Sequence, residues 1–203
     1  MISVIDYGRG NIYSITNALK YLNVSYKVIN DPVNLEESEK IILPGVGAFK
    51  DAMHQLEKRN LIEPIKNYVM GGTPILGICL GMQLFSSKSY EFGESMGLNF
   101  ISGNVKKLPQ GKEDRIPNIG WRFIYPNKNN TTSYINYNNM MYFVHSYGFY
   151  PKDNNNIVAY TEFNSCSIPI IVRKDHIVGC QFHPEKSGKN GLEFLNYFCN
   201  SFR

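Results

Sequence analysis

The sequence is poor in cysteine, and its cysteines are far apart. Four are present among 203 residues, and no two of them form a Cys-x-x-Cys motif. Small disulfide-stabilised domains have a higher density of cysteine, and structural zinc sites have closely spaced pairs of cysteines. Both classes are therefore excluded. We interpret Cys166, Cys180 and Cys199 as small buried apolar side chains, the usual environment of a free cysteine.

The sequence also lacks long apolar runs and blocks of like charge. Its longest apolar stretches, such as residues 41–43 and 75–80, are far shorter than the about 20 residues of a bilayer-spanning helix. Asp6 and Arg9 interrupt the apolar start of the chain, so we expect no secretory signal and a cytoplasmic location. Lysine and arginine number 21 against 17 aspartate and glutamate, which is too small a surplus to indicate a nucleic-acid or membrane partner.

Strand and helix patterns alternate through the first 85 residues. Asn11 precedes apolar residues at helical spacing, which indicates a capped helix. A helical region is expected over residues 49–69, with breaks near Asn60 and Pro64. The apolar strands are expected at residues 1–7, 26–29, 40–43 and 74–78. This alternation predicts a parallel sheet with helical crossovers.

The second half of the chain has a different pattern. Runs of aromatic and β-branched residues alternate with Asn, Gly and Pro turns, which predicts mostly antiparallel strands. These strands are expected at residues 123–125, 140–144, 147–150, 157–161, 168–172 and 177–182. A last helix is expected through residues 192–202, and the Asn-rich residues 127–139 indicate an exposed hairpin or loop.

The fold class that these patterns predict is α/β. We expect a single domain over residues 1–203, since one core commonly reaches this size. Its central, mostly parallel sheet would be flanked by helices, with additional antiparallel strands in the C-terminal half.

Residues 77–81 read Gly-Ile-Cys-Leu-Gly and follow a predicted strand. A nucleophile between two such glycines, where a strand passes into a helix, is typical of a nucleophile elbow, a turn too tight for larger residues. The turn would hold Cys79 at the carboxyl end of the sheet, above a helix N-terminus that favours a thiolate. A buried structural cysteine beside a glycine-rich turn fits the motif equally well.

A thiol nucleophile needs a base, and four histidines are available. His54 lies in the expected helical region, as a surface or packing residue, and His176 in a turn where we expect it to be solvated. The role of His145, after a strand, stays open. His183 follows the last strand, and the turn at Pro184 lets Glu185 reach back to the imidazole, as the third member of a catalytic triad does.

Residues 44–47 read Pro-Gly-Val-Gly directly after a strand. Backbone N–H groups in such a turn can form a nest for a developing oxyanion. The donors expected here are the N–H groups of Val46 and of Leu80, the residue after the nucleophile. An ordinary strand-ending turn is the alternative.

Together these segments resemble the class I (triad) glutamine amidotransferases, and among them the glutaminase subunits of imidazole glycerol phosphate synthase. The elbow and the Gln-Phe-His-Pro-Glu block at residues 181–185 are typical of the superfamily. The Asp-Tyr-Gly-Arg-Gly-Asn opening at residues 6–11, the Phe-Val-His-Ser block at 143–146 and Lys-Ser at 186–187 are typical of the subfamily. The resemblance extends over essentially the whole chain.

The resemblance implies a glutaminase in which Cys79 attacks the carboxamide of glutamine. His183 would pass a proton to the departing ammonia and then activate water, while Glu185 orients the imidazole. No metal or organic cofactor is implied.

The resemblance also implies that the peptide between Gly45 and Val46 must flip to complete the oxyanion hole with the Leu80 N–H. The resting enzyme would then have low activity. The residues that it implies for glutamine binding are Gln83, Glu91, Ser146 and Tyr147.

The partner implied by the resemblance is a barrel-shaped cyclase subunit, which forms a heterodimer with the glutaminase and receives its ammonia through a channel. The residues that the resemblance places at this partner are Asn11, Asn118, Trp121, Arg122, Tyr142 and Lys186. One segment departs from the family, which reads Pro-His-x-Gly-Trp-Asn where residues 117–122 read Pro-Asn-Ile-Gly-Trp-Arg. This departure raises a second interpretation, a paralogue that supplies ammonia for amidino-sugar synthesis on bacterial surface glycans.

Two interpretations from other classes also stay open. A thiol peptidase or a redox-sensing module shares the strand–Cys–helix geometry but does not require Gln83 and Glu91. A non-catalytic assembly partner would share the fold but has no physical need of Cys79, His183 and Glu185 together.

Overall fold

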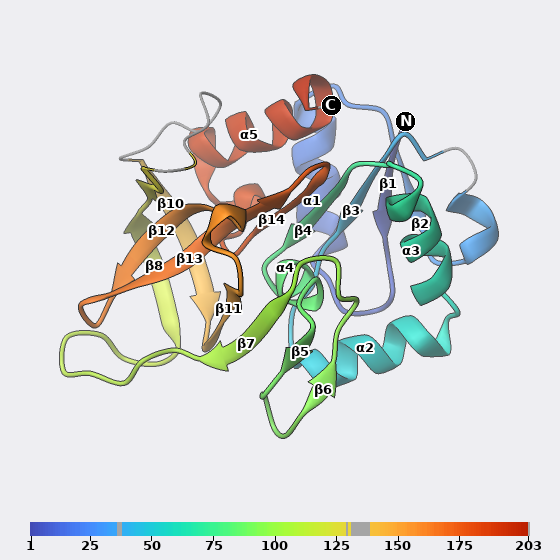
Figure 1. Ribbon diagram of the computed structural model, residues 1–203. Helices are drawn as coiled ribbons and strands as arrows, with labels where there is room; N and C mark the ends of the chain where they lie inside the picture. The colour runs from blue at the N-terminus through green and yellow to red at the C-terminus, as the bar shows by residue number, and fades with distance from the viewer. Residues whose placement is uncertain (36–37, 129, 131–138, 203) are drawn as a thin grey trace.

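The computed structural model describes residues 1–35, 38–128, 130 and 139–202 (Figure 1). Its centre is an eight-stranded sheet in the order β2-β1-β3-β4-β14-β13-β12-β9. Five neighbouring strands are parallel: β2 (Tyr26–Ile29), β1 (Ile2–Ile5), β3 (Lys40–Leu43), β4 (Ile75–Ile78) and β14 (Ile177–Cys180). The remaining three pair antiparallel: β13 (Cys166–Lys174), β12 (Ile157–Phe163) and β9 (Tyr125–Pro126). The predicted mixed α/β sheet is confirmed.

Helices cover both faces of the parallel part of this sheet. Helices α1 (Ile12–Tyr21) and α5 (Gly188–Asn196) lie on one face, and α2 (Phe49–Lys58) and α3 (Ile62–Met70) lie on the other (Figure 1). Side chains alternate along each strand. Ile42 therefore joins the core under α1 and α5, whereas its neighbour Ile41 joins the core under α2 and α3.

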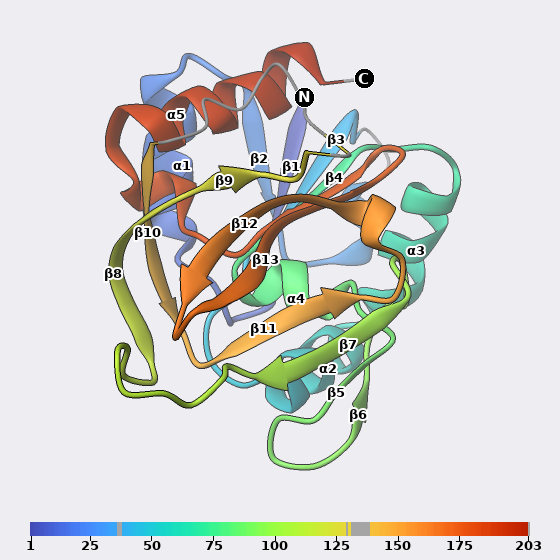
Figure 2. The same ribbon diagram turned by 60° about the vertical axis from the view of Figure 1, so that its left-hand side comes forward.

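Two smaller sheets adjoin the central one. Strands β8 (Asn118–Phe123) and β10 (Met140–His145) form an antiparallel ribbon at one side of the molecule (Figure 2). The other sheet contains β11 (Tyr147–Pro151), β7 (Gly103–Lys107), β5 (Lys88–Ser89) and β6 (Ser95–Met96). Strands β5 and β6 were not expected from the sequence, because they are too short and too polar to show a pattern of alternating apolar residues.

The remaining helical segments are short. Helix α4 (Leu80–Leu84) follows β4 directly. The 3₁₀ turns are Pro32–Leu35, Asn154–Asn156 and Pro184–Lys186, and a π-helical turn, Tyr197–Ser201, follows α5.

Several predicted boundaries differ from the structure. The helical region breaks at Asn60 but not at Pro64, because Pro64 lies in the first turn of α3, where a missing N–H loses no intrahelical bond. The strand expected at residues 123–125 is divided between β8 and β9. The last α-helix ends at Asn196, well before Phe202.

Several single-residue predictions can be compared with the structure. Cys180 and Cys199 are buried, but the prediction for Cys166 is wrong, because its side chain is exposed at the start of β13. His54 is exposed, as expected. His176 is half-buried instead of fully solvated, since its Nε2 lies 2.7 Å from the Val69 carbonyl oxygen.

Most of the Asn-rich stretch, residues 129 and 131–138, lies outside the described residues, so the hairpin expected there stays a prediction. The single domain over residues 1–203 also stays a prediction. None of the helices in the described part of the chain has the length and apolar character needed to cross a bilayer.

The turn that presents Cys79 depends on the two glycines beside it. Cys79 has a φ of 54°, in the left-handed region, which marks a strained turn. A Cβ on Gly81 would lie 1.9 Å from the Leu43 carbonyl oxygen, and one on Gly77 would lie 2.7 Å from the Gly81 carbonyl carbon. Backbone therefore packs directly on backbone at the elbow, and a larger residue has no room.

We expect Gly81→Ala to lower the free energy of unfolding by about 3 kcal/mol or more, because the new Cβ must displace the backbone of β3. For a chain of this size, the melting temperature would fall by about 6–12 °C, measured by calorimetry. Gly72→Ala is the control, since its Cβ meets open space and only the positive φ costs about 1–2 kcal/mol. Equal melting temperatures for the two variants would contradict the close approach at Gly81.

Candidate active site

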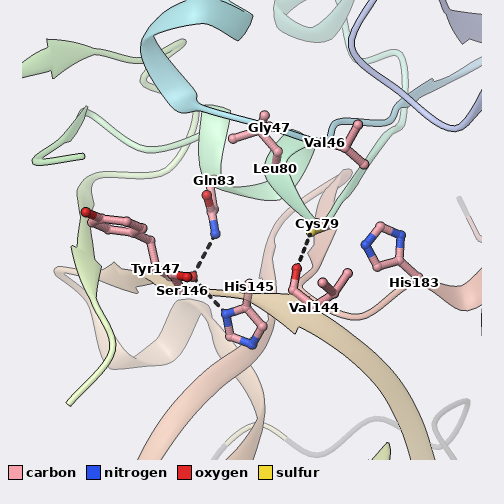
Figure 3. A pocket seen from close by; sticks show the side chains of 10 residues that line it. All are labelled: Val46, Gly47, Cys79, Leu80, Gln83, Val144, His145, Ser146, Tyr147 and His183. Atoms are coloured by element: carbon pink, nitrogen blue, oxygen red, sulfur yellow. Dashed lines mark hydrogen bonds between the residues drawn. The ribbon is translucent and has the colours of Figure 1, made fainter. Parts of the chain in front are cut away.

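A cavity of about 180 Å³ opens beside Cys79 (Figure 3). Four segments line it: the loop after β3, the elbow with α4, the junction of β10 and β11, and the loop after β14. Three of these segments follow parallel strands of the central sheet. In an open α/β sheet, this carboxyl edge is where ligands bind.

The loop after β14 brings His183 to the cavity with Glu185 behind it. His183 Nδ1 lies 2.8 Å from Glu185 Oε1, and their side chains are 3% and 1% exposed. The carboxylate can only accept, so Nδ1 carries the proton. Nε2 is buried and has no hydrogen-bond partner among the described residues, although its ring lies beside Cys79 (Figure 3). The imidazole is thus held by one nitrogen, while the other is available to take a proton.

The charge state of His183 depends on the two groups beside it. Burial alone would lower the pKa of His183, but the Cys79 sulfur and the Glu185 carboxylate together raise it to about 10. The two groups beside it therefore stabilise a positive charge on the imidazole. A cysteine and a histidine, held by a third group, can act as nucleophile and proton carrier in acyl transfer.

The Cys79 sulfur also has two polar neighbours besides His183. It lies 3.9 Å from the Val144 carbonyl oxygen, which can accept the thiol proton, and 3.6 Å from Gln181 Nε2, which donates. Gln181 was not among the site residues expected from the sequence. The motif around His183 draws attention to the histidine, and no spacing rule indicates that the preceding glutamine reaches the sulfur.

Both backbone N–H groups expected in an oxyanion hole have other partners in this structure. The Val46 N–H donates to the Arg9 carbonyl at 3.2 Å, and the Leu80 N–H donates to the Gly45 carbonyl at 3.3 Å. The Arg9 guanidinium also pairs with Asp51 at the start of α2. The loop of residues 44–47 is thus held in a conformation that offers neither N–H to the cavity.

Three of the four residues expected to bind the substrate line the cavity, namely Gln83, Ser146 and Tyr147. Both N–H groups of Gln83 Nε2 are engaged, with the Tyr147 carbonyl at 2.8 Å and Gln181 Oε1 at 2.9 Å. Glu91 does not line the cavity. Its carboxylate accepts the Phe49 N–H at 2.7 Å, where α2 begins, and burial raises its pKa.

His145 is buried between the cavity and the inner side of the ribbon. Its Nδ1 lies 2.8 Å from the Tyr147 carbonyl, and its Nε2 lies 2.9 Å from Asn118 Nδ2. Arg122 bonds to Asn118 Oδ1 and pairs with Asp114 at 2.6 Å. Because a guanidinium only donates, Asn118 must turn its oxygen to Arg122 and its NH₂ to His145. His145 is therefore neutral, with its proton on Nδ1, and burial lowers its pKa to about 4.

The residues expected at a partner divide between the two sides of the β8–β10 ribbon. Asn118 is 1% exposed, and Arg122 bends inward to Asp114, so neither presents its side chain on the outer side. Trp121 is 49% exposed and packs edge-on against Tyr142 at 5.9 Å between ring centroids. Lys186 is exposed, and Asn11 caps α1 by accepting the Ser14 N–H.

Comparison with known proteins gives consistent matches over the whole chain. Residues 3–201 match the family described as glutamine amidotransferase class-I. The chain is 41% identical over 203 residues to "Imidazole glycerol phosphate synthase subunit HisH" of Prochlorococcus marinus subsp. pastoris, covering 100% of this chain and 98% of that protein. It is 43% identical over 199 residues to the protein of the same name from Caldanaerobacter subterraneus subsp. tengcongensis, covering 98% and 97%.

Solved structures agree on the fold. "Structure of PurLQS from Thermotoga maritima" matches with a TM-score of 0.75 at 19% identity, covering 100% of this chain and 98% of that one. "Crystal structure of glutamine amidotransferase" gives the same TM-score at 17% identity, covering 97% and 96%.

The neutral state of His145 predicts a pH-dependent stability. Between pH 6.5 and about 4, the unfolded chain binds a proton at this residue and the folded chain does not. His145 therefore contributes its full share of stability above pH 6.5, and about 3 kcal/mol of it is lost as the pH falls to about 4.

Urea unfolding at a series of pH values would show a shallower pH dependence of the free energy of unfolding for His145→Gln than for the parent. His54→Gln, at an exposed histidine, serves as the control. If His145→Gln and the parent had the same slope, the neutral assignment would be wrong.

Proposed function

Because this chain belongs to the class-I glutamine amidotransferase family, we propose that it is the glutaminase subunit of an imidazole glycerol phosphate synthase. It hydrolyses glutamine to glutamate and ammonia and supplies the ammonia to a cyclase subunit in histidine biosynthesis. The observation that carries this proposal is the convergence of Cys79, His183 and Glu185 at one cavity. A cytoplasmic location and a barrel fold of the partner are parts of the same proposal.

The reaction follows from the positions of three side chains. The thiol of Cys79 first gives its proton to His183 Nε2, and the sulfur then attacks the carboxamide carbon of glutamine. The C–N bond then breaks, His183 gives the proton to the departing ammonia, and a thioester remains. Water attacks the thioester, His183 takes the proton of the water, and the C–S bond breaks to release glutamate. Glu185 keeps the imidazole oriented through Nδ1 and stabilises its charged form.

The loop of residues 44–47 is the element that must change during catalysis. Turning the peptide between Gly45 and Val46 would release the Leu80 N–H from the Gly45 carbonyl and the Val46 N–H from the Arg9 carbonyl. Both donors would then be free for the oxyanion, whose stabilisation is usually a large part of acyl-transfer catalysis. This supports a subunit with low activity until its partner and the partner's ligand are bound.

The cavity also contains groups that fit glutamine. Since both N–H groups of Gln83 are engaged, its Oε1 is the atom left to accept from the substrate amine. Ser146 and Tyr147 line the same side of the cavity. Glu91, which the resemblance implies for glutamine binding, instead accepts a hydrogen bond from the first N–H of α2, directly after the loop of residues 44–47. We therefore assign it an indirect role, in positioning that loop.

The outer side of the β8–β10 ribbon has the character of a docking surface. Its exposed apolar residues, here called the ribbon face, are Ile119, Trp121, Phe123, Met140 and Val144. Val144 also lines the cavity, so a protein bound to this face would contact a residue of the cavity wall. Exposed aromatic and aliphatic side chains gathered in this way are typical of protein interfaces.

Asn118 and Arg122, the two residues that depart from the family's sequence, affect contacts on the inner side of the ribbon more than the ribbon face. Asn118 and Arg122 contact His145 and Asp114, on the inner side of the ribbon, whereas Trp121 on the outer side keeps the family's residue. The substitution pair therefore gives no reason to assign a different partner. The first interpretation, the histidine-pathway subunit, is the one that we retain over the surface-glycan paralogue.

We expect Cys79→Ala to reduce glutamate release by at least about 10³-fold, because the proposed thioester forms on the Cys79 sulfur. Glutamate would be measured with the cyclase subunit from the same cell and its nucleotide ligand present. The matched control is Cys166→Ala, which removes an exposed thiol on β13 and leaves the rate unchanged. Retention of full activity by Cys79→Ala would overturn the nucleophile assignment.

Trp121→Ala should weaken the response to the cyclase, because it removes the largest exposed side chain of the ribbon face. The concentration of cyclase that gives half-maximal stimulation should rise at least about 10-fold, as is usual for a central aromatic residue of an interface. Met70→Ala, at an exposed apolar residue that ends α3, should leave that concentration unchanged. An unchanged value for Trp121→Ala would place the partner on another face.

A further inference from the structure

Gln181 is a fully buried polar residue whose position the triad does not explain. It follows β14, with 0% exposure, and its backbone N–H donates to the Ile170 carbonyl at 2.8 Å. Its side chain lies between Gln83 and the Cys79 sulfur, with atoms in hydrogen-bond contact with each. A buried amide in contact with the nucleophile is placed to influence the chemistry as well as the packing.

The orientation of the Gln181 amide follows from its neighbours. The Tyr147 backbone carbonyl can only accept, so the group of Gln83 that faces it at 2.8 Å is the NH₂ (Figure 3). The second N–H of that nitrogen points to Gln181 at 2.9 Å, which fixes the acceptor Oε1 there. Gln181 Nε2 is then the atom 3.6 Å from the sulfur, and it points an N–H at Cys79.

The same chain of hydrogen bonds continues away from the sulfur. The Tyr147 carbonyl also accepts from His145 Nδ1 at 2.8 Å, and His145 is held through Asn118 by Arg122 and Asp114. Every member of the chain has a defined donor and acceptor direction. If the amide of Gln181 turned over, an N–H of Gln83 would lose its acceptor in a buried site, or Gln83 would have to turn its own oxygen towards the Tyr147 carbonyl.

We propose that Gln181 is a catalytic residue of the glutamine hydrolysis proposed above, and that its Nε2–H stabilises negative charge on the Cys79 sulfur. The sulfur carries this charge twice, as the thiolate that attacks the carboxamide and as the leaving group when water opens the thioester. An N–H donor favours the thiolate in both cases, because hydrogen bonds to an ionised acceptor are stronger than those to a neutral one. Val144, whose carbonyl accepts from the thiol, favours the protonated form.

The titratable groups near the sulfur come from three other segments. They are His183 on the loop after β14, Tyr7 after β1 and Cys180 at the end of β14. Gln181 does not titrate, so its removal leaves these charges in place. A shift in the pH profile of the sulfur would therefore report the lost hydrogen bond.

The test is alkylation of Cys79 by iodoacetamide at a series of pH values, which requires no glutamine. Cys166→Ser is the background, since it removes the exposed thiol, and the modified peptide is identified by mass. Gln181→Met keeps the length of the side chain but cannot donate. We expect its alkylation profile to move up by about one pH unit, with a rate about 10-fold lower on the rising part of the profile. Its kcat for glutamate release should fall by about 10–100-fold, with a smaller change in KM.

Thr161→Val is the matched control for loss of a buried hydrogen bond. Thr161 is 1% exposed and donates to the Phe123 carbonyl in β8, at a distance from the sulfur site. Its alkylation profile should match that of the background chain. A parental profile in Gln181→Met would overturn the proposal and leave Gln181 a packing residue. Slow glutamate release by the parent in the presence of the cyclase subunit and its ligand, together with a shifted profile in Gln181→Met, would instead contradict the proposed function. It would leave intact the stabilisation of charge on the Cys79 sulfur by Gln181.

A second measurement covers the case in which Gln181→Met does not fold. In the unmodified chain, the side-chain NH₂ signals of Gln181 in an NMR spectrum should shift as the pH is raised and the sulfur ionises. The shift should be absent in Cys79→Ala. Signals that do not respond to pH, or that respond equally in both chains, would overturn the proposal.

Discussion

The close approach of the Leu43 carbonyl to Gly81 joins β3 to the nucleophile elbow without any side chain between them. The Cys79 N–H in turn donates to the Cys180 carbonyl at 2.8 Å, which fixes the elbow to β14. Because three neighbouring strands are held in this way, the loops that follow them carry Val46, Cys79 and His183 to the same cavity. Acyl transfer depends on placing such groups within about 1 Å of a productive geometry, and loops on a rigid sheet edge meet that requirement.

Polar groups behind the cavity are almost all paired, and their directions are therefore fixed. From Asp114 to Cys79, each donor has an acceptor, so the orientation of every amide in the series is defined by the one before it. Among the described residues, the buried side-chain atoms without a partner are Asn139 Nδ2, His183 Nε2 and Glu185 Oε2. Two of the three belong to the candidate triad. An unpaired nitrogen is costly in a buried site, and His183 Nε2 is the atom that catalysis requires to be free for a proton.

The resting arrangement of residues 44–47 and the ribbon face both bear on how a bound partner would activate the site. The N–H groups that would stabilise an oxyanion are occupied by carbonyls of Gly45 and Arg9, so the cavity holds the nucleophile but not the complete oxyanion hole. Val144 lies on the ribbon and in the cavity wall at once, and its carbonyl faces the sulfur. A partner that binds the ribbon face thus contacts a strand that touches the nucleophile, which gives partner binding a direct physical route to the site.

Local sequence determines those features of this protein that depend on neighbouring residues. Apolar period and glycine spacing predict β1 to β4 and the elbow at Cys79. The residue types of Asn11 and Pro184 predict the capped start of α1 and the pairing of His183 with Glu185. Each of these features involves residues close together in the chain. Contacts between distant segments were not predictable in the same way. Gln181 contacts the sulfur of Cys79, which lies 102 residues away in the chain. Glu91 accepts a hydrogen bond from the start of α2 instead of facing the cavity. Asn118 and Arg122 turn inward because β8 alternates its side chains between two sides. Only the packed sheet decides which side of each strand faces the cavity, since that choice depends on which segments lie above and below it.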